Sequence, residues 1–196
     1  MVRAMDETVT IRLAGAADAA ALTQLYRDFL DSQFALDAFA ERNPAFDAAA
    51  WVERRLRGSD VRVHVAAEGA ALVGFCDCSV RGGAGAASRL SFAGVRPFLR
   101  SLRARLGRGS TDSYMAPRRV GYIHNTFVAP THRGAGVGGR LVESCLTDMR
   151  GAGADAIYVN TLAANGEAQQ LFGAHGFAPE SLLLRWREGQ TWKPGE

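Results

Sequence analysis

Lysine is almost absent from this sequence: Lys193 is the only one, although lysine and arginine together number 23. The P-loop of nucleotide-binding proteins needs a lysine directly after its second glycine, so that class of phosphate site is excluded. Cysteine is also scarce. Cys76, Cys78 and Cys145 are too few for a disulfide framework, and the pair Cys76-x-Cys78 lacks a second pair at zinc spacing. We therefore expect a reducing environment and no metal site.

Long apolar runs are missing as well. No run approaches the about 20 residues that cross a bilayer, and the first residues lack the apolar core of a signal peptide. Together with the cysteine content, this predicts a cytoplasmic protein without a membrane partner. A chain of 196 residues that is 47% hydrophobic can bury a sizeable core, so we expect a single domain over residues 1–196.

What the sequence does contain is a glycine-rich segment between a strand pattern and a helix pattern. Residues 122–128 are largely β-branched and aromatic, which predicts a strand that Pro130 ends. The segment Arg133-Gly134-Ala135-Gly136-Val137-Gly138-Gly139 follows, and apolar residues then recur at helical spacing. The first turn of a helix carries unpaired N–H groups and partial positive charge, and glycines let a ligand approach them. This order predicts a pyrophosphate site.

The dinucleotide fingerprint G-x-G-x-x-G is present at Gly134, Gly136 and Gly139. Its context differs from that of a dinucleotide-binding protein. Residues 129–133 separate the strand from the first glycine, and the next strand pattern ends in Asn160 where an acidic residue is expected. An NAD-dependent oxidoreductase therefore stays the alternative interpretation.

The segment from Val128 to Gly138 resembles motif A of the GNAT superfamily of N-acetyltransferases, in which Arg/Gln-x-x-Gly-x-Gly/Ala follows a strand. Residues 165–177 are similar to the family segment N-x-x-A-x-x-L-Y-x-x-x-G-F, in the order the family has. The resemblance implies an α/β domain of the GNAT acyl-CoA N-acyltransferase fold, a mixed central β-sheet of six to seven strands flanked by α-helices. It also implies transfer of an acetyl group from acetyl-CoA to a primary amine of a small molecule or a protein N-terminus.

The same resemblance implies which residues hold coenzyme A. They lie at the end of the strand, in the glycine-rich loop and in the second motif: Phe127, Val128, Arg133, Gly134, Ala135, Gly136, Val137, Gly138, Gly139, Asn165 and Phe172. The amide of Val128 would donate to the thioester carbonyl. Asn165 would bond the pantetheine arm, although capping a helix is an equally natural role for it.

Two residues are expected to move protons. His124 stands where many members have a glutamate, and its imidazole would act as the base, directly or through a water. A buried histidine bonded to the sheet is the alternative for that position. Phe172 stands where the family has the tyrosine that protonates the leaving thiolate, so water or Tyr158 would replace it. This departure keeps a non-catalytic acyl-CoA-binding regulatory module open.

Residues 81–119 are expected to form an arginine-rich insertion, with a basic amphipathic helix over 91–106. Three roles compete for it: a solvated helix over the sheet, part of an acceptor or homodimer surface, and a patch for an anionic partner. The last ranks third because no nucleic-acid motif accompanies the charge.

The rest of the chain is expected to supply the remaining elements. Strand patterns occur at residues 7–13, 61–67, 71–80 and 181–189, and helix patterns at 17–30 and 46–57. Asp31, Asp37 and Glu41 lie between the two helix patterns, where they would either suit a cationic amine or be solvated. His64 is expected to be a surface or sheet histidine without a catalytic role.

Overall fold

The structure, a computed structural model, describes residues 9–37, 40–82 and 119–181. The expected basic helix at 91–106 lies outside these residues, and so does the expected strand at 181–189 apart from residue 181. Within the described part of the chain, no helix is long and apolar enough to cross a membrane.

One five-stranded sheet forms the centre of the molecule, in the order β1-β2-β3-β4-β5. Four strands, β1 (Val9–Leu13), β2 (Arg62–Glu68), β3 (Ala71–Gly82) and β4 (Arg119–Val128), follow one another as antiparallel neighbours. β5 (Ala156–Val159) lies parallel to β4. This mixed sheet confirms the predicted fold class, with five strands described where six to seven were expected.

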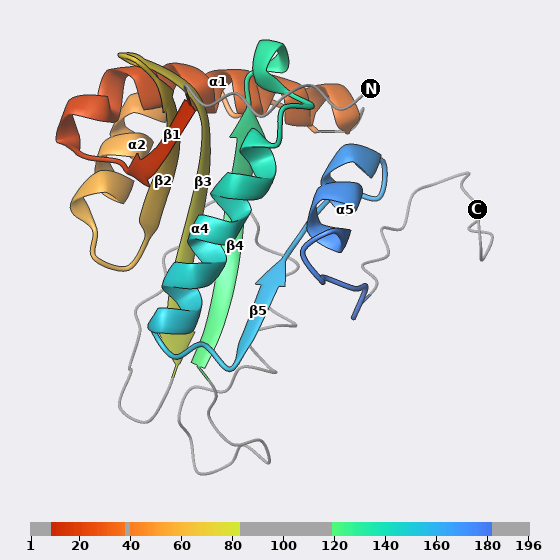
Figure 1. Cartoon of the computed structure of the whole chain (residues 1–196). Coiled ribbons are helices and arrows are strands. Elements are labelled where there is room, and N and C mark those ends of the chain that lie inside the picture. The colour runs from red at the N-terminus through yellow and green to blue at the C-terminus, as the bar shows by residue number, and fades with distance from the viewer. Residues whose placement is uncertain (1–8, 38–39, 83–118, 182–196) are drawn as a thin grey trace, which may run out of the picture.

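Helices cover both faces of the sheet (Figure 1). α1 (Ala19–Leu36) and α2 (Ala48–Arg57) lie on one face, and α4 (Val137–Gly151) lies along the other. α5 (Gly166–Gly173) follows β5 and packs beside α4. α1 runs past its expected end near residue 30 because residues 31–36 contain neither glycine nor proline, and it ends where Asp37 takes up an extended backbone.

Each face of the sheet has its own apolar core, because successive side chains of a strand point to opposite faces. Phe75 packs with α1 and α2, whereas its neighbour Cys76 belongs to the core under α4. The same alternation separates Val63 and Val65 from His64. His64 is only 4% exposed, however, because α4 covers that face of β2.

Candidate active site

β4 and β5 stay paired only along the first part of β4. Their register runs from Val120 opposite Ala156 to Ile123 opposite Val159, while β4 continues beside β3 to Val128. Among the described residues, 124–128 therefore have a strand neighbour on one edge only, and we call their other edge the open edge of β4.

Hydrogen bonds at the end of β4 show which backbone groups face the open edge. The amide of Ala129 donates to the carbonyl of Val73 at 2.8 Å. Hydrogen-bonded positions alternate along an antiparallel ladder, so the N–H of Val128 points away from β3. Its carbonyl points the same way, since it accepts a hydrogen bond from Arg133 Nε at 3.0 Å. An extended ligand arm along this edge would therefore meet a backbone donor at Val128.

The glycine-rich loop leads from β4, through a short 3-10 turn (Pro130–His132), into α4. Gly134 and Gly136 have φ angles of +74° and +81°, a conformation that side chains disfavour. A Cβ atom at either position would meet no described atom within 4 Å. Gly136 is the N-cap of α4, so the amides that follow it lack partners within the helix. The loop thus presents backbone donors to open space.

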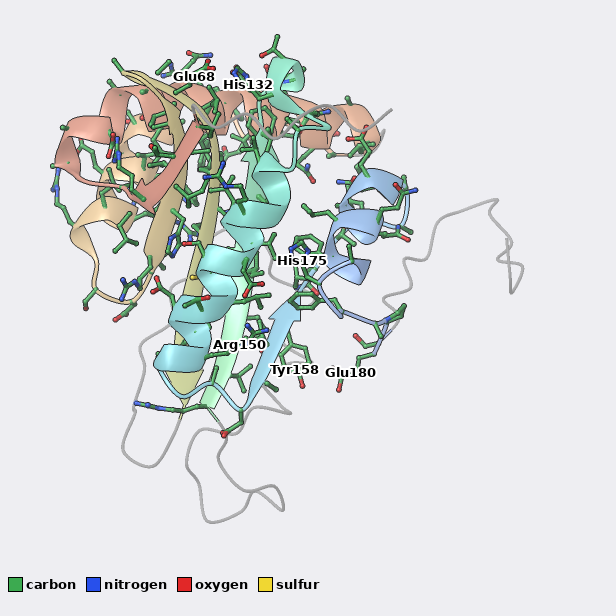
Figure 2. All side chains as sticks on the ribbon, in the orientation of Figure 1. Glu68, His132, Arg150, Tyr158, His175 and Glu180 are labelled. Atoms are coloured by element: carbon green, nitrogen blue, oxygen red, sulfur yellow. The ribbon has the colours of Figure 1, made fainter. Side chains whose placement is uncertain are left out.

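The last two glycines of the loop have a different role. A Cβ on Gly138 would lie 3.5 Å from Leu171 Cδ2, and one on Gly139 would lie 3.3 Å from His175 Cε1. His175 lies between α4 and α5 (Figure 2). These two glycines therefore allow the start of α4 to pack closely against the α5 segment.

The other residues expected to hold coenzyme A surround this loop. Arg133 links β4 to α5, because its guanidinium also pairs with Glu167 at 3.4 Å. Asn165 caps α5, where its Oδ1 accepts a hydrogen bond from the Ala168 amide at 3.0 Å. Phe172 is 6% exposed and contacts Phe177 in the core, with the ring centroids 5.6 Å apart. The capping role of Asn165 is thereby confirmed.

His124 is the extra residue of a β-bulge in β4. The register passes from Asp77 opposite Asn125 directly to Cys78 opposite Ile123. Such a bulge redirects a side chain, and His124 Nε2 lies 2.8 Å from the hydroxyl oxygen of Ser79. Burial lowers the pKa of His124 to about 4, so the imidazole is neutral at neutral pH.

Tyr122 lies between the two residues that the sequence predicts to move protons. Its ring stacks on His124, with centroids 6.4 Å apart, and on Tyr158, with centroids 5.8 Å apart. Its hydroxyl is buried and has no hydrogen-bond partner among the described residues. Burial raises the pKa of Tyr122, which keeps this hydroxyl protonated. We did not single out Tyr122 from the sequence, although it stands two residues before His124 on the same strand.

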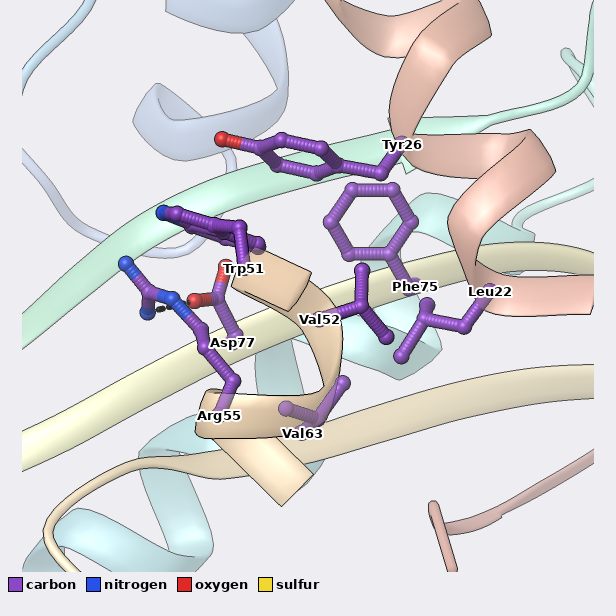
Figure 3. A pocket seen from close by; sticks show the side chains of 8 residues that line it. All are labelled: Leu22, Tyr26, Trp51, Val52, Arg55, Val63, Phe75 and Asp77. Carbon is purple, nitrogen blue, oxygen red and sulfur yellow. Dashed lines mark hydrogen bonds and ion pairs between the residues drawn. The ribbon is translucent and has the colours of Figure 1, made fainter. Parts of the chain in front are cut away.

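A pocket lies on the α1 and α2 face of the sheet (Figure 3). Its walls are aromatic and aliphatic except for one ion pair: Leu22, Tyr26, Trp51, Val52, Arg55, Val63, Phe75 and Asp77 line it. Asp77 is 1% exposed. It pairs with Arg55 and accepts a hydrogen bond from Asn125 Nδ2 at 2.9 Å. The only signal for this carboxylate in the sequence is its place in an otherwise apolar strand.

Arg55 itself is held by an aromatic stack. Its guanidinium lies 4.1 Å from the centre of the Trp51 ring, and Trp51 stacks on Tyr26 with centroids 3.9 Å apart. A guanidinium over an aromatic face is attracted by the ring electrons. The described pocket thus already contains a cation paired with its one carboxylate.

The acidic residues between α1 and α2 lie elsewhere. Asp31 pairs with Arg42 at 2.7 Å, and their side chains are 59% and 64% exposed. Asp37 is the C-cap residue of α1. Neither lines the described pocket. Asp31 thus corresponds to the solvated alternative.

Two comparisons place these features among known proteins. The family model described as "Acetyltransferase (GNAT) family" matches residues 20–177. No curated protein matches the sequence significantly.

Solved structures resemble the fold over nearly the whole chain. A tetramutant of the BH1408 protein from Bacillus halodurans has 16% identity and a TM-score of 0.67, with 91% of this chain and 99% of that chain covered. The aminoglycoside N-acetyltransferase AAC(6')-Iy in complex with CoA has 17% identity, a TM-score of 0.60, and coverages of 93% and 95%. The ribosomal-protein-alanine N-acetyltransferase from Brucella melitensis biovar Abortus 2308 has 16% identity, a TM-score of 0.60, and coverages of 91% and 99%. At these identities the likeness concerns the fold.

Replacing Arg55 by Met should destabilise the protein by about 3–5 kcal/mol, because Asp77 would stay buried without its cation. The matched control is Arg57→Met. Arg57 pairs with Glu53 across side chains that are 76% and 51% exposed, so its loss should cost at most about 1 kcal/mol. Urea unfolding measures both. Equal losses in the two variants would contradict the role given to the buried pair.

Proposed function

The chain belongs to the acetyltransferase (GNAT) family, which makes it an acyltransferase with acetyl-CoA as its donor, and we propose that it acetylates a primary amine of a small molecule or of a protein N-terminus. The observation that carries this proposal is the open edge of β4 leading into the glycine loop. A backbone donor at Val128 and a helix start with free amides lie on consecutive parts of the chain. A thioester and a pyrophosphate joined by an extended arm match that arrangement.

The donor site follows from this geometry. The N–H groups after Gly134 and Gly136 would bind the pyrophosphate, with Arg133 at the side of the loop. The pantetheine would lie along residues 127–128, and the Val128 amide would donate to the thioester carbonyl. Asn165 uses its oxygen to cap α5. Its side-chain NH₂ therefore remains as the group that would bond the pantetheine.

The chemical step needs one proton acceptor and one proton donor. The imidazole of His124 would take a proton from the bound ammonium, directly or through a water. Because its pKa is only about 4, it would hold this proton briefly and pass it on to solvent. The amine nitrogen then attacks the thioester carbon, and the Val128 amide stabilises the negative oxygen of the tetrahedral intermediate. As this intermediate collapses, the C–S bond breaks and the nitrogen gives its second proton to solvent, from which Tyr158 would later recover the proton it donates. Tyr158 would give its phenolic proton to the departing thiolate.

The described pocket has room for about one water molecule, so only the charges of the residues around it bear on the acceptor, and they argue for a single amine. A polycation such as an aminoglycoside is best matched by several unpaired carboxylates. Here Asp77 is the one carboxylate among the described lining residues, and Arg55 already neutralises it. AAC(6')-Iy is named for aminoglycosides, whereas the Brucella structure is named for an alanine of a ribosomal protein. These neutral, aromatic surroundings favour the second kind of acceptor, an amine carried on a less charged molecule.

Acetyl-CoA-dependent thiol release tests the proposal with peptides, amino acids, monoamines, polyamines and aminoglycosides as acceptors. We expect turnover, with higher kcat/KM for monoamines or peptide N-termini than for polycations.

Gly136→Ala should raise the KM for acetyl-CoA about tenfold or more, because a side chain strains the backbone at this φ and crowds the amides that would bind the pyrophosphate.

Gly69→Ala is the matched control for that variant. Gly69 also has a positive φ of +58° and open space around it, but it lies in the β2–β3 turn. Its replacement should carry a similar backbone cost and leave the KM for acetyl-CoA unchanged. Binding of coenzyme A without turnover for any acceptor would point to the non-catalytic module instead.

His124→Gln should lower kcat/KM about 10²-fold, since the proton acceptor is lost. In the unmodified enzyme, kcat/KM should fall as the pH drops through about 4, because His124 is protonated in the free enzyme below its pKa of about 4 and can no longer accept a proton.

Tyr158→Phe should lower kcat, whereas Tyr122→Phe removes a buried hydroxyl and should leave kcat nearly unchanged. A pH–rate profile measured for all four proteins checks this assignment. An acidic limb that stays in place in His124→Gln would overturn the role of the histidine.

A further inference from the structure

Three soft ligand groups converge under α4, on the face of the sheet away from the pocket. They are His64 on β2, Cys78 on β3 and Cys145 on α4, and all three are buried. One donor atom from each residue lies within 4.8 Å of the other two. Their separation along the chain gave no sign of this, since Cys145 and His64 are brought to Cys78 only by the packing of α4 on the sheet.

The spacing is close to that of a metal site. An ion at the centre of three donors within 4.8 Å of one another would lie at most about 2.8 Å from each of them. Zn–S bonds are about 2.3 Å long and Zn–N bonds about 2.0–2.1 Å. Small movements of the side chains would therefore close the three groups around an ion.

The surroundings of His64 match those of a ligating histidine. Its Nε2 lies 2.7 Å from the Asp148 carboxylate, which also pairs with Arg62 at 2.7 Å. Histidine ligands usually direct their second nitrogen to such a carboxylate, which fixes the ring. The other nitrogen, Nδ1, lies 2.8 Å from the hydroxyl oxygen of Ser144. An ion bound by Nδ1 would take the place of this hydroxyl, which requires Ser144 to adopt another χ1 rotamer.

We propose that His64, Cys78 and Cys145 bind one thiophilic metal ion. Zn²⁺ is the ion that best matches this set of two sulfur ligands and one imidazole. Thiolate and imidazole ligands select such ions over Mg²⁺ or Ca²⁺. Binding releases the two thiol protons to solvent, and the resulting pair of thiolates balances the charge of Zn²⁺. A neutral site is what a buried position requires. The ion would tie α4 to β2 and β3, and this inference revises the expectation of no metal site.

The test uses the full, untagged chain with reduced thiols and the metal alone. After treatment with a chelator, Co²⁺ and then Zn²⁺ are titrated in. We expect one equivalent of Co²⁺ to bind with the strong visible bands of thiolate coordination, and Zn²⁺ to displace it. Zn²⁺ should also raise the Tm, because an ion that binds only the folded state stabilises it.

Cys78→Ser and Cys145→Ser should each weaken binding at least tenfold. Cys76→Ser is the matched control, because Cys76 is buried on the same strand and its Sγ lies next to Thr126 Oγ1, at 3.2 Å. It should keep both the affinity and the spectrum. Cys76 does interact with Cys145, whose Sγ donates to the Cys76 carbonyl at 3.7 Å, but this backbone acceptor is retained in the variant. Equal loss in Cys76→Ser would contradict the assignment of Cys78 and Cys145 as the two sulfur ligands, and no stoichiometric binding by the unmodified chain would show that the three cysteines are core residues only.

Asp148→Asn keeps the test decisive if a cysteine variant fails to fold. It leaves all three ligands in place and removes only the carboxylate that orients His64, so affinity should fall about 10- to 100-fold. Circular dichroism of each metal-free variant establishes that it is folded. Unchanged affinity in a folded Asp148→Asn protein would contradict the assignment of His64 as a ligand.

Discussion

The feature on which the rest of this structure depends is that β4 extends beyond the end of its pairing with β5. β5 ends its pairing at Val159, opposite Ile123, while β4 runs on to Val128. A strand edge without a neighbour carries unpaired backbone donors and acceptors, which a ligand can satisfy as an added strand would. At the end of that edge, the glycine loop turns the chain into α4 and adds further free amides. The donor site that we propose is thus built mainly from backbone groups, and the glycines leave room for it.

The two faces of the sheet divide the remaining work. On the α1 and α2 face, an aromatic stack holds Arg55 beside the buried Asp77. Such a pair is costly to form and more costly to break, so Arg55 and Asp77 stay paired in this pocket. On the α4 face, apolar residues and the sulfur and imidazole groups hold the helix whose first turn faces the donor site. A change in how α4 packs on the sheet would therefore alter the position of the glycine loop.

Local patterns predicted the parts of the structure that depend on neighbours in sequence. Alternation gave the β2–β3 hairpin, and the glycine loop before a periodic helix was visible from its residues alone. The end of α1 was missed because residues 31–36 favour neither helix nor loop strongly, and tertiary contacts decide such cases. The burial of His64 depends on α4, which lies far along the chain.

The missed features of the candidate site have the same origin. The Arg55–Asp77 pair joins residues 22 positions apart on different elements, and no spacing rule reports it. The direction of the His124 side chain depends on a register shift between β3 and β4. The Tyr122–Tyr158 contact depends on the parallel pairing of β4 with β5. Sequence reasoning named residues, and the structure supplied the relations among them.

Amide hydrogen exchange with and without coenzyme A tests the central claim most directly. If the open edge and the loop bind the donor through backbone groups, exchange should slow at Val128 and across residues 134–138, and stay unchanged in the turn at Gly69. The opposite result, tight binding of coenzyme A with no added protection at Val128 or in the loop, would show that the donor lies elsewhere on the molecule.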